Sequence, residues 1–348
     1  MTFAIHQYTS AITKADGVSN SLFFIKKMLT ALGHESEIYA DNINPELKAL
    51  VRPRHTYQEN RNNILLIHHA VAQAEPVWFI NLPDHLVMVY HNITPTHYFE
   101  PGTAHSNATK QGREQLAGWQ DLFDGIIADS EYNAQELNGL GYKNVHTIPL
   151  LIDFDNIKKT TESRQIINRH ETTFNLLFVG RICENKCQHD LVHALARLGN
   201  KNVHLFCVGG NTSPPYLEYI KKLVAGYGLQ EQVHLPGKVS DQDLWGYYHA
   251  ADLFVSLSDH EGFGIPLIEA SSIGLPVVAY DSSNIRHTLA GSGLILSHKN
   301  STDVAAVLQR LMTQPLWRHR LAQGQQANLS RFDFENLKTG LNAFINSL

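Results

Sequence analysis

The chain alternates short apolar runs with amphipathic stretches along its whole length. The runs are nearly all apolar, a pattern typical of strands in a parallel sheet that helices cover on both faces. In the first half, the expected strands are 3–8, 37–40, 64–68, 87–90, 125–128 and 145–148. In the second half, they are 175–179, 203–208, 233–235, 253–257, 277–280 and 293–296.

Helical patterns separate these strands in both halves. The first half has them at 21–32, 111–122 and 133–140; the second has them at 188–198, 216–227, 241–249, 266–273, 302–312 and 315–329. Residues 332–348 read as one more helix. Two strand–helix series predict an α/β protein with two Rossmann-like, doubly wound parallel-sheet domains.

A polar segment divides the two series. With 348 residues the chain is long for one domain, and no strand pattern appears from 151 until 174. We therefore expect an N-terminal domain over 1–158 and a C-terminal domain over 159–331. The helix at 332–348 is expected to pack back onto the first domain.

Composition excludes several classes of protein. A net charge of −5 argues against a general nucleic-acid binder, which would carry a basic excess. Three cysteines, Cys183, Cys187 and Cys207, form no disulfide framework and favour a reducing compartment. Cys183 and Cys187 have no second ligand pair nearby, so ordinary thiols are expected instead of a zinc site.

The N-terminus lacks the basic and apolar regions of a signal peptide, and no run of 18 apolar residues occurs. These features predict a cytoplasmic protein. They leave open peripheral contact with the inner face of a membrane.

Residues 260–270 carry the strongest local signal for function. Pro266 suits the first turn of a helix, and Gly274 with Pro276 suits its end. Glu261 should then lie in a loop and Glu269 in the second helical turn. The backbone N–H groups at the helix start form an anion site, which the sequence assigns to Gly262, Phe263 and Gly264.

An anion site flanked by two carboxylates fits a nucleotide sugar, whose diphosphate would meet the N–H groups and whose hydroxyl groups would meet the carboxylates. Glycine-rich loops before helices are also common, so this stretch alone leaves a structural role open. Other polar clusters strengthen the functional interpretation, because each follows a strand, where open parallel sheets bind ligands. They are Asp16 to Ser19, His91 to Pro95, and Gly180-Arg181 with Lys186.

Taken together, these motifs resemble glycosyltransferase family 4, retaining enzymes with the GT-B fold. The matching segments are Tyr90-His91-Asn92-Ile93-Thr94-Pro95, Val179-Gly180-Arg181 with Asn185-Lys186, Glu261 to Glu269, and Gly274 to Ala279. The resemblance covers essentially the whole chain. It implies two Rossmann-like domains facing a central cleft, the N-terminal one binding the acceptor and the C-terminal one the nucleotide sugar.

The resemblance also implies roles for single residues. Glu269 would bind the ribose, and Glu261 the donor hexose. Arg181 and Lys186 would bind the diphosphate, and His91 would lie beside the transferred sugar as a donor-hydroxyl contact or, less favoured, a base. The remaining donor contacts would be Gly17, Gly262, Phe263, Gly264 and Ile265. The family commonly has two glycines where this chain has Asp16-Gly17, which leaves that loop's approach to phosphate in doubt.

The implied reaction transfers a hexose from GDP-mannose or a UDP-hexose to a glycan or lipid-linked saccharide. Arg181 and Lys186 can stabilise the leaving diphosphate, so front-face transfer needs no metal or other cofactor. Asp153 and Asp155 form a D-x-D, the metal motif of another glycosyltransferase fold, but lie at the domain seam and are interpreted as structural. Bacterial relatives with the motif at 90–95 resemble mannosyltransferases and other enzymes of surface-polysaccharide synthesis.

Two other classes remain open: another GT-B-like enzyme, such as a sugar-nucleotide epimerase or a phosphorylase, and a non-catalytic nucleotide-sugar-binding protein. An NAD dehydrogenase is poorly supported, because no G-x-G-x-x-G follows the first strand. Donor identity, acceptor, linkage and oligomeric state are not determined by the sequence.

Overall fold

The computed structural model describes residues 4–13, 17–154, 157, 161–169 and 172–348. The chain forms two compact units: Met1–Leu151 with Arg331–Leu348, and Ile152–Ser330. The expected boundary at 158/159 lies outside the described residues, and the units divide seven residues earlier.

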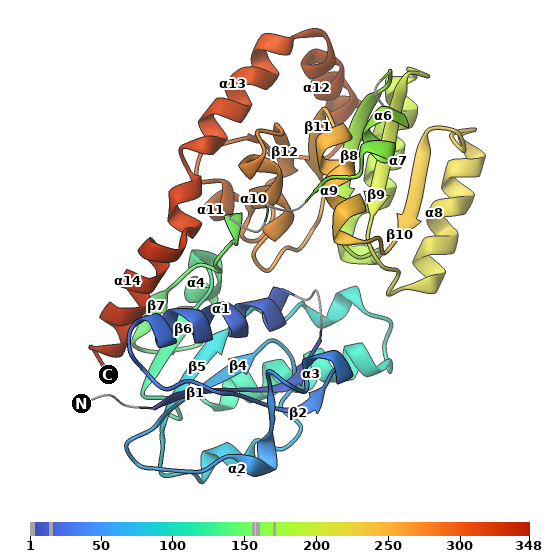
Figure 1. Cartoon of the computed structure of the whole chain (residues 1–348). Coiled ribbons are helices and arrows are strands. Elements are labelled where there is room, and N and C mark those ends of the chain that lie inside the picture. The colour runs from blue at the N-terminus through green and yellow to red at the C-terminus, as the bar shows by residue number, and fades with distance from the viewer. Residues whose placement is uncertain (1–3, 14–16, 155–156, 158–160, 170–171) are drawn as a thin grey trace. The chain divides into compact units, whose positions relative to one another are not determined.

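The first unit is built on a parallel sheet with strand order β3-β2-β1-β4-β5-β6-β7 (Figure 1). The sheet reverses its winding between β1 and β4, which places the ends of these two strands side by side. Its strands are β1 (Ile5–Ile12), β2 (Ile38–Ile43), β3 (Arg52–Pro53), β4 (Ile64–His69), β5 (His85–Tyr90), β6 (Gly125–Ala128) and β7 (Val145–Thr147).

The helices of this unit include the C-terminal one, which lies against α1 (Figure 1). Its inward side chains Leu337, Leu341 and Phe344 join the core formed by the sheet and α1. The helices are α1 (Gly17–Ala31), α2 (Val77–Ile80), α3 (Ala104–Gly118), α4 (Glu131–Gly139) and α14 (Phe334–Ile345).

The second unit contains a parallel sheet with strand order β10-β9-β8-β11-β12-β13. Its strands are β8 (Phe174–Val179), β9 (Val203–Val208), β10 (Val233–Gly237), β11 (Leu253–Ser256), β12 (Val277–Tyr280) and β13 (Leu294–Leu296). Its helices are α6 (Arg164–Arg169), α7 (Gln188–Leu198), α8 (Pro214–Gly226), α9 (Asp241–Ala250), α10 (Ile265–Ser272), α11 (Ile285–Leu289), α12 (Ser301–Thr313) and α13 (Pro315–Gln326).

The largest difference from the expected elements is the start of α3. It begins at Ala104 instead of 111, because the Thr103 hydroxyl accepts a hydrogen bond from the Ser106 N–H and caps the helix. Residues 104–110 have almost no apolar side chains, so hydrophobic periodicity could not reveal this first turn. The short β3, α2, α6 and α11 were also not expected.

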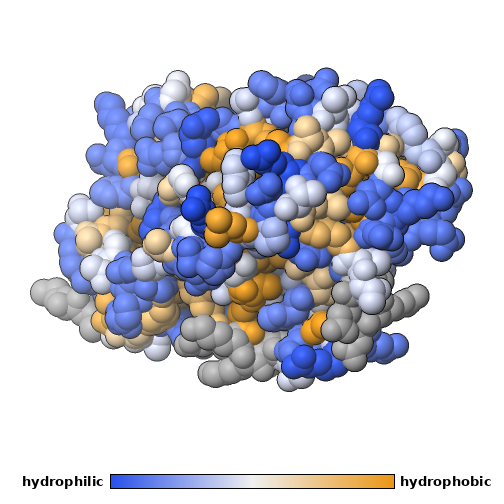
Figure 2. Space-filling model, turned by 90° about the horizontal axis from the view of Figure 1, so that it is seen from above, coloured by the Kyte–Doolittle hydropathy of each residue, from blue (hydrophilic) through white to orange (hydrophobic). Residues whose placement is uncertain are grey.

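Among the described residues, no helix is both long enough and apolar enough to cross a bilayer. On the face in Figure 2, hydrophobic residues lie in groups among hydrophilic ones.

Candidate functional site

Three neighbouring strands of the second unit place their C-terminal loops together. β8, β11 and β12 are adjacent in the sheet and parallel, so the loops that follow them emerge at the same edge. These loops carry Arg181 and Lys186, Glu261 to Gly264, and the segment 281–284.

Lys186 and Glu261 form an ion pair at this edge. Lys186 Nζ lies 2.6 Å from Glu261 Oε2, and the two side chains are only 12% and 13% exposed. The same ammonium donates to the His260 carbonyl at 3.3 Å. A largely buried carboxylate and ammonium therefore neutralise each other where the sequence predicted a sugar–diphosphate site.

Two small polar residues hold this pair in place. The Asn185 side-chain amide donates to the His260 carbonyl at 3.2 Å, and the Asn185 carbonyl accepts from the Asp259 N–H at 2.9 Å. Ser283 Oγ accepts from the Glu261 N–H at 2.8 Å and donates to the Glu261 carbonyl at 2.9 Å. The loops after β8 and β12 therefore both support the backbone of the glutamate loop.

The start of α10 has the expected form. Gly264 caps the helix with a left-handed φ of 87°, and Pro266 lies in the first turn. The Phe263 carbonyl accepts hydrogen bonds from Asn284 Nδ2 at 3.3 Å and from the Thr288 hydroxyl. Pro266 has no N–H, and the Leu267 N–H donates to the Gly264 carbonyl at 3.0 Å. The N–H groups of Gly264 and Ile265 are the ones that can receive an anion at this helix start.

Glu269 lies in the second turn of α10, as expected, and is half-buried. Its Oε2 accepts from the hydroxyl of the fully buried Tyr248 at 2.7 Å. Burial raises the pKa of Glu269 above its ordinary value; the nearby Asp241 raises it further, and the Tyr248 hydrogen bond opposes the rise.

Arg181 is exposed directly after β8 and is free to reach a ligand. The turn before it is tight, because a Cβ on Gly209 would lie 2.1 Å from the Gly180 carbonyl oxygen. Only glycine fits at this position, where φ is 151°.

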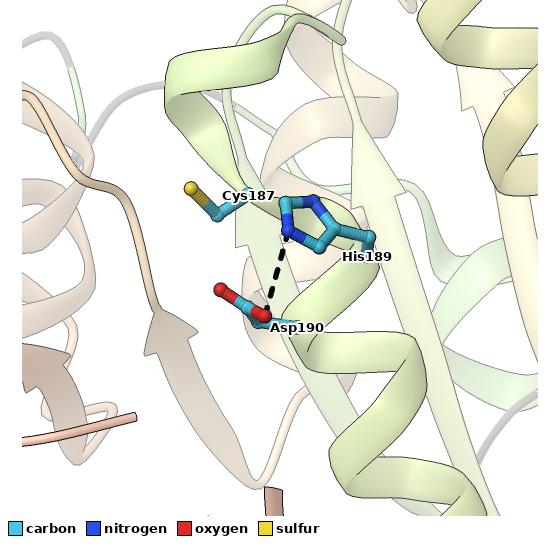
Figure 3. Close-up of side chains that lie close together, drawn as sticks. All are labelled: Cys187, His189 and Asp190. Atoms are coloured by element: carbon cyan, nitrogen blue, oxygen red, sulfur yellow. Dashed lines mark ion pairs between the residues drawn. The ribbon is translucent and has the colours of Figure 1, made fainter. Parts of the chain in front are cut away.

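Cys187, His189 and Asp190 offer three metal-ligand atoms within 4.8 Å at the start of α7 (Figure 3). Lys299 already neutralises this cluster, because its Nζ lies 2.8 Å from Asp190 Oδ2 and 2.6 Å from Asp259 Oδ1. Burial raises the pKa of the Cys187 thiol to about 12, which opposes the thiolate that a metal needs. His189 Nδ1 is engaged by the Tyr216 hydroxyl at 2.7 Å. These side chains therefore fit a structural cluster around the Lys299 ammonium better than a metal site.

The remaining predicted residues lie in the first unit. Gly17 is the first residue of α1, and Asp16 is outside the described residues. His91 follows β5, as expected, but its side chain is 1% exposed. Both ring nitrogens are engaged, Nε2 by His68 Nδ1 at 2.8 Å and Nδ1 by Asp129 Oδ2 at 3.3 Å.

The structure thus brings Lys186, Glu261 and the start of α10 together within the second unit. Asp155 of the D-x-D lies outside the described residues. Sequence reasoning included Asn185 in a matching segment without giving it a role, and it missed two further supporting residues, Ser283 and Tyr248. Ser283 was detectable, because the polar run 281–284 directly follows the strand 277–280. Tyr248 was not, because its contact with Glu269 joins two different helices.

Comparison with known proteins shows what the chain is similar to. Residues 159–328 match the family described as "Glycosyl transferases group 1". A D-inositol 3-phosphate glycosyltransferase of Thermobifida fusca is 29% identical over 237 residues, which cover 63% of this chain and 54% of that protein. A mannosylfructose-phosphate synthase of Agrobacterium fabrum is 32% identical over 150 residues, 40% of this chain and 33% of that protein. The matches thus span about half the length of the first of these relatives.

Solved structures share the fold over nearly the whole chain. Anabaena HepE, solved in complex with UDP-glucose, has a TM-score of 0.79 at 17% identity and covers 99% of this chain and 100% of its own. Sucrose-phosphate synthase from Thermosynechococcus elongatus has a TM-score of 0.78 at 17% identity, covering 99% and 98%. The predicted GT-B fold class, two Rossmann-like parallel-sheet domains, is confirmed. The family match thus covers residues 159–328, just under half of the chain, while the shared fold extends over nearly all of it.

Proposed function

We propose that the protein is a retaining glycosyltransferase that moves a hexose from a nucleotide-diphosphate sugar to a glycan or lipid-linked saccharide. The observation that carries this proposal is the Lys186–Glu261 pair beside the start of α10, within the family-matched domain. A cation, a carboxylate and free helix N–H groups lie at one sheet edge. Such a set binds the diphosphate and the hydroxyl groups of one donor molecule.

The ion pair explains how the site remains stable before a donor binds. Without donor, Lys186 and Glu261 neutralise each other, so neither charge is left unpaired in a largely buried position. On donor binding, the ammonium turns to the diphosphate, and the carboxylate accepts hydrogen bonds from the hexose hydroxyl groups. Glu269 binds the ribose in the same way, with Tyr248 orienting its carboxylate.

The chemistry follows from where charge develops. Cleavage of the anomeric carbon–oxygen bond leaves negative charge on the nucleoside diphosphate, which Lys186, Arg181 and the N–H groups of α10 stabilise. Front-face attack then allows the leaving phosphate oxygen to take the acceptor's proton. In this proposal, these groups stabilise the leaving group without a metal. Glu261 acts as a sugar ligand.

The donor is proposed to be a UDP-hexose or GDP-mannose. Support for a UDP-sugar comes from HepE, which was solved with UDP-glucose. Support for a saccharide acceptor comes from one relative and one solved structure, both named as synthases of phosphorylated disaccharides.

Incubation of the purified protein with UDP-glucose, UDP-galactose, GDP-mannose and related donors tests the proposal. Without acceptor, slow release of free hexose and nucleoside diphosphate is the expected result; with a saccharide acceptor, the nucleoside diphosphate should be released faster and the hexose should appear on the acceptor. Interconversion of donors would identify an epimerase instead, and binding without turnover a non-catalytic binding protein. Glu269→Ala should abolish nucleotide-sugar binding; intact binding in this variant would contradict the site.

A further inference from the structure

A continuous chain of buried hydrogen bonds runs across four neighbouring strands of the first unit. Gln7 of β1 contacts His68 of β4, His68 contacts His91 after β5, and His91 contacts Asp129 after β6. The successive atom pairs are Gln7 Oε1 with His68 Nε2 at 3.0 Å, His68 Nδ1 with His91 Nε2 at 2.8 Å, and His91 Nδ1 with Asp129 Oδ2 at 3.3 Å. All four side chains are buried.

The two imidazoles meet edge to edge. Their planes differ by only 15°, and the 5.1 Å between centroids matches the 2.8 Å nitrogen separation plus the two ring radii. The facing nitrogens therefore point at each other within nearly one plane. This is the geometry of a hydrogen bond, and it requires one hydrogen between the two nitrogens.

The outer ends of the chain have fixed polarity. Gln7 Nε2 donates to the Leu22 carbonyl at 3.0 Å, so the Gln7 oxygen is the atom that faces His68 and can only accept. Reversing this amide would place two oxygens against each other at the Leu22 carbonyl.

The other end is fixed in the same way. Asn92 Nδ2 donates to the Glu136 carboxylate and to Asn133 Oδ1, at 3.2 Å and 2.8 Å. Asn133 therefore presents its amide N–H to Asp129 Oδ1, which accepts. Any proton on Asp129 must lie on Oδ2, facing His91.

Counting hydrogens gives the result. Three gaps lie between the Gln7 oxygen and Asp129, and each needs one hydrogen. Two neutral imidazoles and a carboxylate supply only two, because a neutral imidazole carries one N–H and a carboxylate none. One gap would then hold two bare acceptors in contact, without solvent to separate them.

We propose that His68, His91 and Asp129 hold one additional proton at neutral pH, so that each gap contains one hydrogen and the cluster has no net charge. It forms a proton-loaded strut that links β1 and β4 to the segments that follow β5 and β6. His91 and Asp129 are positioning residues in this strut.

The surroundings place the additional proton between His91 and Asp129. Burial holds the pKa of His68 well below its ordinary value, and burial raises the pKa of Asp129. His69, the next residue on β4, points to the opposite face of the strand, where its Nε2 meets the Gly112 carbonyl at 3.2 Å. Burial lowers its pKa to about 4. Glu136 of α4 is paired with Arg113 of α3 at 2.8 Å and hydrogen-bonded to Tyr90, so these described neighbours add no unpaired charge.

Nuclear magnetic resonance of the full chain with ¹⁵N-labelled histidine tests the count directly. At neutral pH we expect His91 Nε2 and His68 Nε2 to be protonated and the facing His68 Nδ1 to be bare. We also expect a third hydrogen between His91 Nδ1 and Asp129, seen as a protonated Nδ1 or, with ¹³C-labelled aspartate, as a protonated carboxyl; a bare Nδ1 beside an ionised carboxylate would contradict the proposal. Two bare facing nitrogens at neutral pH would overturn the proposal. The measurement uses the unmodified protein, so it does not depend on how a variant folds.

Asp129→Asn provides a sharper test. The Asn oxygen can accept from Asn133 while its N–H donates to His91 Nδ1, so a covalent hydrogen replaces the additional proton. The hydrogen between the two histidines should then persist to alkaline pH. In the wild type, deprotonation leaves a charged Asp129 carboxylate, which draws the remaining His91 hydrogen onto Nδ1, so the hydrogen between the two histidines should be lost. Asp124→Asn is the matched control, because Asp124 pairs with the exposed His85 at 3.4 Å in the same unit. It should leave the His68 and His91 signals unchanged; a variant-independent loss at alkaline pH would contradict the proposal.

A consequence for catalysis rests on the proposed function. Loss of the proton at alkaline pH leaves two hydrogen-bond acceptors, His68 Nδ1 and His91 Nε2, facing each other. The kcat of the wild type should therefore fall at alkaline pH. Asp129→Asn should lack this alkaline decline, and equal decline in both would remove the positioning role while leaving the proton count standing. If no donor is turned over at all, the proposed function fails, and the resonance result still decides the strut.

Discussion

In the Lys186–Glu261 contact, two residues that are proposed to bind the donor also have a structural role. Both side chains are largely buried, and each is the other's closest countercharge. Charges in such positions are stable only when paired, because desolvation penalises an isolated ion. A substitution at either position therefore changes the stability of the empty protein as well as donor binding.

Lys186→Met should reveal both effects. It keeps the aliphatic stem but leaves the Glu261 carboxylate without its cation, which should lower the free energy of unfolding by about 1–3 kcal/mol. The double variant Lys186→Met/Glu261→Gln should recover most of this loss, as measured by urea denaturation. In both variants the transition state for transfer should lose about 3 kcal/mol of stabilisation, so the transfer rate should fall. Full recovery of transfer in the double variant would contradict a role for Lys186 at the diphosphate.

Glu269 should give donor binding a pH dependence. Burial raises its pKa above the unfolded value of 4.5, so between the two values the native state binds more protons and its stability falls as the pH rises. Donor binding has the opposite sign, because the ribose hydroxyls need the ionised carboxylate as acceptor. Nucleotide affinity should therefore weaken as the pH falls through the raised pKa.

Tyr248→Phe should move that loss of affinity to higher pH, since the tyrosine hydroxyl stabilises the ionised carboxylate. Glu269→Gln should remove the pH dependence altogether. Calorimetric titration with nucleotide across the acidic range measures both. An unchanged profile in the phenylalanine variant would show that the 2.7 Å hydrogen bond does not tune Glu269.

The start of helix α10 depends on contacts with its neighbours more than on the helix propensity of its own residues. It has eight residues, too few to be stable alone, and its cap is a glycine with positive φ. Asn284 and Thr288, at and within α11, hold the Phe263 carbonyl just before it. The anion-binding end of the helix therefore depends on a neighbouring helix.

Gly264→Ala should destabilise the protein more than Gly274→Ala. Both glycines have positive φ, 87° and 77°, so both variants carry backbone strain. Only at Gly264 would the new Cβ also meet a buried side chain, Leu267 Cδ1 at 2.8 Å; at Gly274 nothing lies within 4 Å. Thermal unfolding should show about 1 kcal/mol or more between the two variants. Equal losses would mean that Leu267 yields without cost.

The chain returns to its first unit at its C-terminus. After crossing the second unit, α14 packs into the core of the first, where the Phe344 ring lies 5.1 Å from the His146 ring. A Cβ on Gly125 of β6 would lie 2.9 Å from Phe344 Cζ, so the two elements are in close contact. The first unit is therefore complete only when the last residues of the chain are present.

Phe344→Ala should accordingly lower the free energy of unfolding of the first unit by about 3–5 kcal/mol, the usual cost of a large cavity in a core. Thr339→Ala, an exposed position on the same helix, should change it little. Hydrogen exchange, which resolves the two units, should show lost protection in β6 and β7 for Phe344→Ala. Equal effects of the two substitutions would contradict a core role for α14.

Most of the fold was predictable because near-continuous apolar strands such as 203–208 and 253–257 can be buried only in a covered parallel sheet. Both ends of α10 were equally predictable, because Pro266 suits a first helical turn, and Gly264 and Gly274 can adopt the positive φ found just outside the two ends. Elements without apolar periodicity, such as the first turn of α3, were missed, since a side-chain cap at Thr103 and not a buried face defines them.

The amino-acid sequence determined two parallel sheets, the loops that follow their strands, and the glutamates, lysine and glycines placed in those loops. These properties are local, because strand burial, helix caps and left-handed turns depend on residues close in the chain. Only the tertiary structure decided that Lys186 pairs with Glu261, that Tyr248 holds Glu269, and that His91 is buried between His68 and Asp129. These contacts join residues 21 to 75 positions apart, and strand order, which sequence periodicity does not encode, is what brings them together.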